Sequence, residues 1–288
     1  MSRIVVTGGS GRSGQVVVRD LVERGHEVRN VDIVPPAAAD CAFVEADVTS
    51  YGDMLAACHG YDVLVHLAAH PSPDFDLTTG AGRFRTNTLS TFNAFQAAVA
   101  LGMQRVVWAS SVTVLGYPFR NCKPASVPVD ETHTPLPQNS YALSKVACEH
   151  LAEYMHRLHG VTYIGLRFSN IFYEDTGHRA NYSKVPGFWV DIDLRRQDLW
   201  SYVDARDVAQ SIRLALAADI EGAEVFNIAA ADTIMKQTNA ELIAETFPDV
   251  QAGKELGPYQ TLVSINKAER MLGYKPEWSW RQILGDVR

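Results

Sequence analysis

Short apolar runs alternate with longer segments of helical spacing along the first half of the sequence. The runs are rich in β-branched residues and nearly continuous in apolar character, as in strands covered on both faces. They are Arg3 to Thr7, Glu27 to Asp32, Ala42 to Val48, Asp62 to Ala68, Arg105 to Ser110 and Thr162 to Phe168. Helices are expected at Arg12 to Arg24, Tyr51 to His59, Phe84 to Leu101 and Ser140 to His159. This alternation predicts an α/β fold, a Rossmann-type doubly wound parallel sheet.

The alternation of strand-like and helical segments becomes irregular after Phe168 and returns only in part. A strand (Leu199 to Val203), a helix (Ala205 to Ala217) and a strand (Glu224 to Ile228) are expected there. We therefore predict a first domain over residues 1–168, to which 198–230 returns, and a small interleaved C-terminal lobe from 169–197 and 231–288. The stretch from Pro118 to Pro137 is proline-rich and polar, which indicates a long loop.

Composition narrows the class of protein. The chain has 288 residues, 47% hydrophobic and 20% charged, which is typical of a globular protein. A net charge of −7 argues against a nucleic-acid partner, because phosphate-backbone binding needs concentrated Lys and Arg. The apolar runs are far shorter than the ~20 residues that cross a bilayer, and the first residues lack a signal peptide's apolar core. We expect a cytoplasmic protein with no membrane partner.

The cysteines do not indicate a metal site. Their positions are Cys41, Cys58, Cys122 and Cys148, widely spaced and without a CxxC pair or a suitable neighbouring His. We expect four reduced thiols and no metal.

A glycine-rich turn follows the first predicted strand directly. Gly8, Gly11 and Gly14 are spaced G-x-x-G-x-x-G, with Arg12 and Ser13 opening the helical pattern. Glycine permits positive φ and lets the backbone approach a pyrophosphate, whose charge the helix N-terminus then meets. Taken alone, such a turn often only joins a strand to a helix.

An acidic residue strengthens the interpretation of this turn. Asp32 closes the second strand about twenty residues further on, where a carboxylate accepts hydrogen bonds from the adenosine ribose and repels a 2′-phosphate. NAD is therefore the expected cofactor. Arg12 leaves NADP open, because an arginine in the turn is able to pair with that phosphate.

Two further features suggest catalytic chemistry. Tyr141 and Lys145 are four apart on one predicted helix face, where the ammonium, helped by a positive nicotinamide, lowers the pKa of the phenol toward neutrality. Ser110 and Ser111 end the fifth strand, at the edge of the sheet where α/β folds bind ligands. Each feature also has an ordinary explanation, an amphipathic helix face in one case and a strand-terminal serine bonded to loop backbone in the other.

Taken together and in order, these pieces resemble the extended short-chain dehydrogenase/reductase family, also called the NAD-dependent epimerase/dehydratase family. The resemblance covers nearly the whole chain. Besides the residues above, it rests on Asp47-Val48, His66-Leu67-Ala68-Ala69, Asn87 to Asn93, Arg167 to Asn170 and Tyr202 to Val208.

The resemblance implies a role for each site residue. Ser111 holds the substrate oxygen, Tyr141 exchanges its proton, and Lys145 tunes Tyr141 and binds the nicotinamide ribose. It also implies a homodimer packed through the helices that contain Asn87 to Ala100 and Tyr141 to Tyr154. The cofactor-binding set that it implies is Gly8, Gly11, Arg12, Ser13, Gly14, Asp32, Asp47, Val48, Leu67, Ala68, Ala69, Asn87, Ser110, Tyr141, Lys145 and Phe168.

The segment after Asn170 bears on the substrate. Only about thirty residues separate Asn170 from Tyr202, fewer than family members that clamp a nucleotide usually have there. By that resemblance we expect a substrate smaller than a nucleotide sugar. Uronate dehydrogenases resemble this chain in that shortening and place an arginine for the sugar carboxylate at the offset of Arg179. Arg179 also fits a solvated basic loop. With Thr113, which follows Ser111 closely, these residues complete the expected substrate site.

Three functions remain open at this point. The leading hypothesis is an NAD-dependent oxidoreductase acting on a sugar, sugar acid or similar polyol. The second is a nucleotide-sugar epimerase or dehydratase that retains NAD. The third is a catalytically idle NAD-binding regulatory protein, because a fold does not guarantee chemistry.

Overall fold

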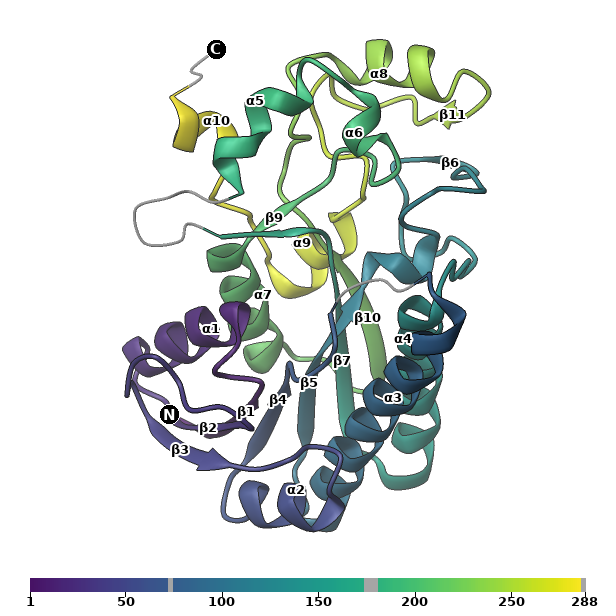
Figure 1. Ribbon diagram of the computed structural model, residues 1–288. Helices are drawn as coiled ribbons and strands as arrows, with labels where there is room; N and C mark the ends of the chain where they lie inside the picture. Colours follow the sequence, from purple (N-terminus) through teal and green to yellow (C-terminus); the bar gives the residue numbers. More distant parts are fainter. Residues whose placement is uncertain (72–74, 174–180, 286–288) are drawn as a thin grey trace. The chain divides into compact units, whose positions relative to one another are not determined.

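The structure is a computed structural model that describes residues 1–71, 75–173 and 181–285 (Figure 1). The strands of the main sheet are β1 (Arg3–Thr7), β2 (Glu27–Asp32), β3 (Ala42–Glu45), β4 (Val63–His66), β5 (Arg105–Ser111), β7 (Thr162–Phe168) and β10 (Ala223–Ile228). The short strands are β6 (Ser126–Val127), β8 (Ile171–Phe172), β9 (Val203–Asp204) and β11 (Gln251–Ala252). The longer helices are α1 (Arg12–Glu23), α2 (Tyr51–Cys58), α3 (Leu77–Ala100), α4 (Ser140–His159), α7 (Ala205–Ala217) and α8 (Asn239–Thr246). The shorter helices are α5 (Val185–Phe188), α6 (Asp193–Arg196), α9 (Asn266–Leu272) and α10 (Trp280–Leu284), with 3-10 turns η1 (Val112–Leu115) and η2 (Tyr182–Lys184).

Seven strands form one sheet in the order β10-β7-β5-β4-β1-β2-β3. The pairs β1–β2, β1–β4, β2–β3 and β4–β5 are parallel, and the predicted Rossmann-type doubly wound fold is confirmed. The strand order reverses between β1 and β4, which are neighbours with Thr7 opposite His66. The loops that follow these strands therefore leave the same edge of the sheet, where open α/β folds bind ligands.

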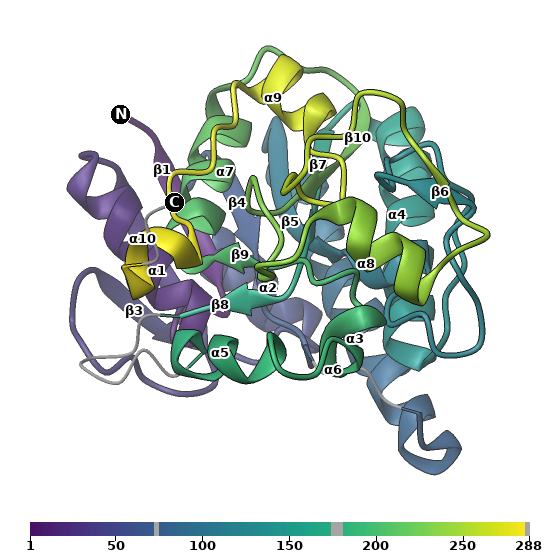
Figure 2. The same cartoon turned by 90° about the horizontal axis from the view of Figure 1, so that it is seen from above.

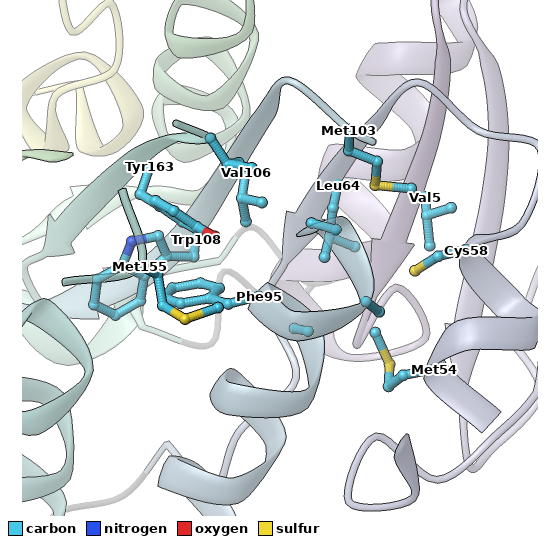
Figure 3. Packing of buried hydrophobic residues seen from close by; sticks show 14 of the residues in the cluster. Val5, Met54, Cys58, Leu64, Phe95, Met103, Val106, Trp108, Met155 and Tyr163 are labelled. Atoms are coloured by element: carbon cyan, nitrogen blue, oxygen red, sulfur yellow. The ribbon is translucent and has the colours of Figure 1, made fainter. Parts of the chain in front are cut away.

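Helices α2, α3 and α4 cover one face of the sheet. Their apolar side chains pack with inward residues of the strands in one buried cluster (Figure 3). Phe95 of α3 lies at its centre, with ring centroids 5.8 Å from Trp108 and 4.4 Å from Tyr163. Met155 of α4 borders these rings, and Met54 of α2 occupies the other end of the cluster. Burial of this aromatic and aliphatic surface fixes the three helices against the strands.

Helices α1 and α7 lie on the opposite face (Figures 1 and 2). The buried side of α1 is Val17, Val18 and Leu21, spaced as on one helix face. Arg213 of α7 joins α1 through an ion pair with Asp20, Nε to Oδ2 at 3.3 Å. This layer holds the start of α1 directly after the glycine-rich turn.

The chain packs into two compact units. Unit 1 is Met1–Ser111, Asn139–Leu166 and Ala209–Val225; unit 2 is Val112–Gln138, Arg167–Val208 and Phe226–Arg288. Within unit 2 a buried network ties distant segments together: Asp232 accepts from Tyr202 at 2.7 Å and from Ser279 at 2.8 Å. The division into a cofactor domain and a substrate lobe stays a prediction. Over the described ranges, no helix combines the length and apolarity that a bilayer span requires.

Several predicted elements differ from the structure, and the strands expected to reach Val48 and Ala68 end earlier, at Glu45 and His66. The strand expected from Leu199 is wrong, because Leu199 and Trp200 have φ of 49° and 51°, which no strand accommodates. Only Val203–Asp204 pairs there, as β9. Helix α3 begins at Leu77, seven residues before the predicted start at Phe84, since Asp76 caps it by accepting from the Thr78 N–H at 2.8 Å.

His66, the last residue of β4, is buried as a neutral imidazole. Its Nδ1 lies 2.7 Å from the Thr7 hydroxyl and its Nε2 3.4 Å from that of Thr91. Burial, together with the positive charge of Lys145, lowers the pKa of His66 from 6.5 to about 3. Unfolding restores the ordinary value, so the unfolded chain takes up a proton below pH 6.5 that the folded chain does not.

We predict that this histidine makes the fold sensitive to acid. Its contribution is complete above pH 6.5 and is lost as the pH falls toward 3, at about 1.4 kcal/mol per pH unit. Between pH 7 and 5 the free energy of unfolding of H66N should therefore fall by about 2 kcal/mol less than that of the wild type. Urea unfolding at both pH values measures this. H150N, which removes an exposed histidine of α4, is the matched control, and equal slopes for wild type and H66N would contradict the assignment.

Candidate active site

The glycine-rich turn packs backbone against backbone at the end of β1. The Gly8 N–H donates to the Val31 carbonyl at 2.8 Å, and Gly8 has φ of +73°. A Cβ on Gly8 would lie 2.7 Å from the Ala68 nitrogen, and one on Gly14 would overlap the Gly8 carbonyl. Side chains at either position would displace the turn, which accounts for glycine at both.

The N-terminus of α1 has the properties of an anion site. Its N-cap is Gly11, no side chain caps it, and its first turn has no acidic residue. Arg12 and Ser13 open the helix. The helix dipole therefore favours a negative ligand next to the glycine turn, and these residues fit the pyrophosphate of a dinucleotide.

Asp32 is held in a fixed orientation beside this turn. Its Oδ2 accepts from the Ser10 N–H at 3.1 Å and its Oδ1 from the Ile33 N–H at 2.8 Å. The carboxylate is half-buried and keeps further lone pairs, which fit the hydroxyls of an adenosine ribose. Buried Asn30, which the sequence analysis did not single out, supports the turn by donating to the Ser10 hydroxyl at 3.0 Å.

The loops after β3 and β4 carry the other predicted cofactor contacts. Leu67 continues β4 by donating its N–H to the Thr7 carbonyl at 3.0 Å, and Ala68 then lies against Gly8. Ala69 follows in the same loop, next to His70. Buried Asn87 of α3 fixes this loop, because its Oδ1 accepts from the His70 N–H at 2.9 Å.

Asp47 and Val48 follow β3 and are held mainly by local contacts. The Asp47 carboxylate accepts from both the N–H and the hydroxyl of Thr49, each at 2.8 Å. The Val48 carbonyl accepts from Asn93 of α3 at 3.1 Å. The loop that carries this pair is therefore anchored to α3 within unit 1.

The three candidate catalytic side chains meet inside unit 1. Ser111, Tyr141 and Lys145 are 7%, 7% and 3% exposed. The Ser111 and Tyr141 side chains are hydrogen-bonded to each other. Lys145 Nζ donates to the Ala109 carbonyl at 2.7 Å, and the same nitrogen lies 5.7 Å from the centre of the Tyr141 ring. Asn139 starts α4 by accepting from the Ala142 N–H at 2.9 Å.

Burial dominates the electrostatics of this group. It raises the pKa of Tyr141 to about 12, although the Ser111 hydrogen bond acts in the opposite direction. It also lowers the pKa of Lys145. The expectation that the Lys145 ammonium brings the phenol toward neutrality is therefore not met in the protein alone. A phenolate near neutral pH requires a further positive charge beside Tyr141, such as an oxidised nicotinamide.

Ser110 is buried in β5 of unit 1, and the remaining predicted residues belong to unit 2 or lie outside the described ranges. Thr113 is buried in η1, and Phe168 is buried at the end of β7. Arg179 falls within residues 174–180, which the structure does not describe. Asn170 is exposed, and its carboxamide oxygen accepts from both terminal nitrogens of Arg195 at 2.6 Å.

The contact between Arg195 and Asn170 was not expected from the sequence. One terminal nitrogen of Arg195 also lies 3.1 Å from Asp198. Since the guanidinium holds the oxygen of the Asn170 amide, the NH₂ group is the part left to donate to a ligand. In the part of the chain that is described, no group of three His, Cys, Asp or Glu side chains is arranged to hold a metal ion.

Comparison with known proteins identifies the family. The model of the NAD dependent epimerase/dehydratase family matches residues 4–229. The chain therefore belongs to the NAD-dependent epimerase/dehydratase family, whose cofactor is NAD, and it is an enzyme of the short-chain dehydrogenase/reductase type.

Its relatives include both epimerases and dehydrogenases. A UDP-glucose 4-epimerase from Corynebacterium glutamicum is 24% identical, covering 99% of this chain and 97% of the relative. An L-arabinose 1-dehydrogenase (NAD(P)(+)) from Haloferax volcanii is 31% identical, covering 58% of this chain and 66% of the relative. The solved structure of a mutated uronate dehydrogenase superposes with a TM-score of 0.70 at 21% identity, covering 99% of this chain and 85% of that one. At that identity the likeness establishes the fold alone.

The glycine turn gives a testable prediction. G14A should weaken NAD binding by about tenfold or more, ~1.4 kcal/mol, because the new Cβ pushes the Gly8 carbonyl out of place. Isothermal titration calorimetry with NAD measures the change. G52A is the matched control, since a Cβ on Gly52 in α2 meets nothing within 4 Å. Wild-type affinity in G14A would show that the turn does not hold the cofactor.

Proposed function

We propose that this protein is an NAD-dependent dehydrogenase that oxidises a secondary alcohol carbon of a sugar, sugar acid or similar polyol. The observation that carries the proposal is the buried group of Ser111, Tyr141 and Lys145 in the same unit as the glycine turn and Asp32. NAD, when bound, supplies the carbon that accepts the hydride.

Each residue of the group has a role that its contacts support. The Tyr141 oxygen takes the proton of the substrate hydroxyl as its carbon is oxidised. The Ser111 hydroxyl, already bonded to Tyr141, orients the same substrate oxygen. The Lys145 ammonium, fixed by the Ala109 carbonyl, keeps positive charge beside the phenol and binds the nicotinamide ribose.

A small substrate is supported by one feature of the chain and by one of its relatives. The segment between Asn170 and Tyr202 is short, about thirty residues. The arabinose dehydrogenase relative also acts on a free sugar, according to its name. In our proposal the Asn170 amide donates to a substrate oxygen, Thr113 lines the same site, and Arg179 binds a carboxylate if the substrate is an acid.

A nucleotide-sugar epimerase with retained NAD is the second candidate. It is favoured by the full-length match to a UDP-glucose 4-epimerase. The two candidates differ in one observable quantity, because a dehydrogenase releases NADH in proportion to substrate whereas an epimerase shows no net reduction of NAD.

We predict net NADH formation from at least one uronic acid, aldose or polyol. Absorbance at 340 nm measures it across a panel that includes UDP- and dTDP-sugars. Y141F should lower kcat by ~10²- to 10⁴-fold with NAD affinity nearly unchanged, because it removes only the proton acceptor. Y154F, at an exposed position of the same helix, is the matched control. Isomerised UDP-sugar without NADH release would reject the dehydrogenase in favour of the epimerase, and a fully active Y141F would reject the assigned role.

We also propose a homodimer packed through α3 and α4, in the cytoplasm. The helices pack against each other, and each exposes apolar side chains: Leu89 and Phe92 on α3, Leu143, Tyr154 and Leu158 on α4, between 41% and 73% exposed. Two copies would bury these faces in a four-helix contact. All four cysteines are free thiols, which supports a reducing compartment.

The dimer has its own test. Light scattering after gel filtration should give twice the chain mass for the wild type and the chain mass for F92E, because a buried carboxylate opposes association. L194E changes an exposed leucine of α6 outside these helices and should stay dimeric. A monomeric wild type would end the proposal.

A further inference from the structure

The last three residues of β5 each contact one residue of α4. The outer two hold Tyr141 and Lys145, as described above. The middle one, Ser110, donates its hydroxyl to Glu149 Oε1 at 2.6 Å. The helix residues are spaced four apart and share one face, so the strand end contacts three successive turns of α4. Glu149 therefore belongs to the same contact as the candidate catalytic residues.

Glu149 is a carboxylate in an unusual place. It is 8% exposed, and a buried charge is costly unless an opposite charge or hydrogen bonds compensate it. Ser110 supplies one hydrogen bond, and Lys145, one turn earlier, supplies the opposite charge. Burial lowers the pKa of Lys145, while Cys148 and then Glu149 act in the opposite direction and raise it.

The other titratable groups around Lys145 do not replace this carboxylate. On α4 they are Tyr141 and Cys148, whose pKa values are both raised by burial, so that both are neutral near pH 7. From β4, His66 interacts with Lys145 and is also neutral at that pH. Of these described groups, Glu149 is the one carboxyl group that interacts with Lys145.

We propose that Glu149 is a positioning residue of the catalytic group: its charge, held by Ser110, keeps Lys145 as an ammonium directed at the strand end beside Tyr141. The proposal rests on the proposed function, because it assigns Lys145 its task. It adds a fourth member to the group, one that acts through Lys145 and needs no contact with substrate.

The direct test is the titration of Lys145 in E149Q. Glutamine keeps the oxygen that accepts from Ser110 and removes the charge. Lysine-selective ¹⁵N labelling follows each Nζ by NMR, and loss of one resonance in K145R assigns Lys145. In E149Q, Lys145 should lose its proton about one pH unit lower than in the wild type. E153Q removes an exposed carboxylate of the same helix, paired with His150, and should leave the titration unchanged.

S110A serves as a second variant. It releases the carboxylate without removing its charge, so the Lys145 midpoint should shift downward by less than in E149Q. Circular dichroism checks that each variant keeps its fold. A Lys145 midpoint equal to that of the wild type in the folded variants would overturn the proposal.

Turnover gives a separate readout. With a substrate that the wild type oxidises, E149Q should narrow the pH profile of kcat/KM from the alkaline side. The alkaline limb moves down because Lys145 deprotonates earlier, whereas the acidic limb does not move up, because Lys145 stays protonated at acidic pH. A shifted Lys145 titration in a protein that reduces no NAD supports the Glu149 coupling and rejects the proposed function, so the two failures are distinguishable.

Discussion

A phenol and an ammonium are costly to bury, and the contact between the end of β5 and the first turns of α4 is what offsets that cost here. Lys145 donates one N–H to the Ala109 carbonyl of the strand at 2.7 Å, and Tyr141 is hydrogen-bonded to Ser111, the last residue of the strand. The aromatic cluster around Phe95 and Trp108 fixes the strand and the helix layer behind them (Figure 3). The positions of the reactive groups are therefore set by packing on one face of the sheet.

The parallel sheet explains why the candidate cofactor-binding residues and the candidate catalytic residues share unit 1. Every parallel strand delivers its carboxyl end to the same edge, so the glycine turn after β1, Asp32 at the end of β2 and Ser111 at the end of β5 leave the sheet together. The turn is compact enough to touch Ala68 of the next loop, and helix α1 begins at it without a capping side chain. A candidate anion site and a buried phenol thus arise from one arrangement of strands.

Local pattern was sufficient for most of the regular elements. The strands at Arg3–Thr7 and Thr162–Phe168 and the helix Ser140–His159 have the predicted bounds. The irregular turn at Leu199 and Trp200 was mistaken for a strand, because an apolar run has the same pattern whether it forms a strand or a buried turn.

Other features depend on tertiary contacts and carry no local signal. The pairing of Arg195 with Asn170 joins residues far apart in the sequence, and the direction of the Tyr141 pKa depends on burial. The position of Glu149 one helical turn after Lys145 was predictable from the sequence. Its proposed role also depends on the hydrogen bond from Ser110, which the sequence does not show.

In our proposal Tyr141 is a buried phenol that lies beside the nicotinamide ring when NAD is bound. Tyrosinate absorbance at 295 nm, taken as wild type minus Y141F, tests it most directly, in the protein alone and with oxidised NAD. The account predicts no Tyr141 signal in the protein alone until the pH approaches about 12, and a titration at clearly lower pH once the positive nicotinamide is present. A Tyr141 that titrates near pH ~10, the ordinary value of an exposed phenol, with and without NAD would contradict it.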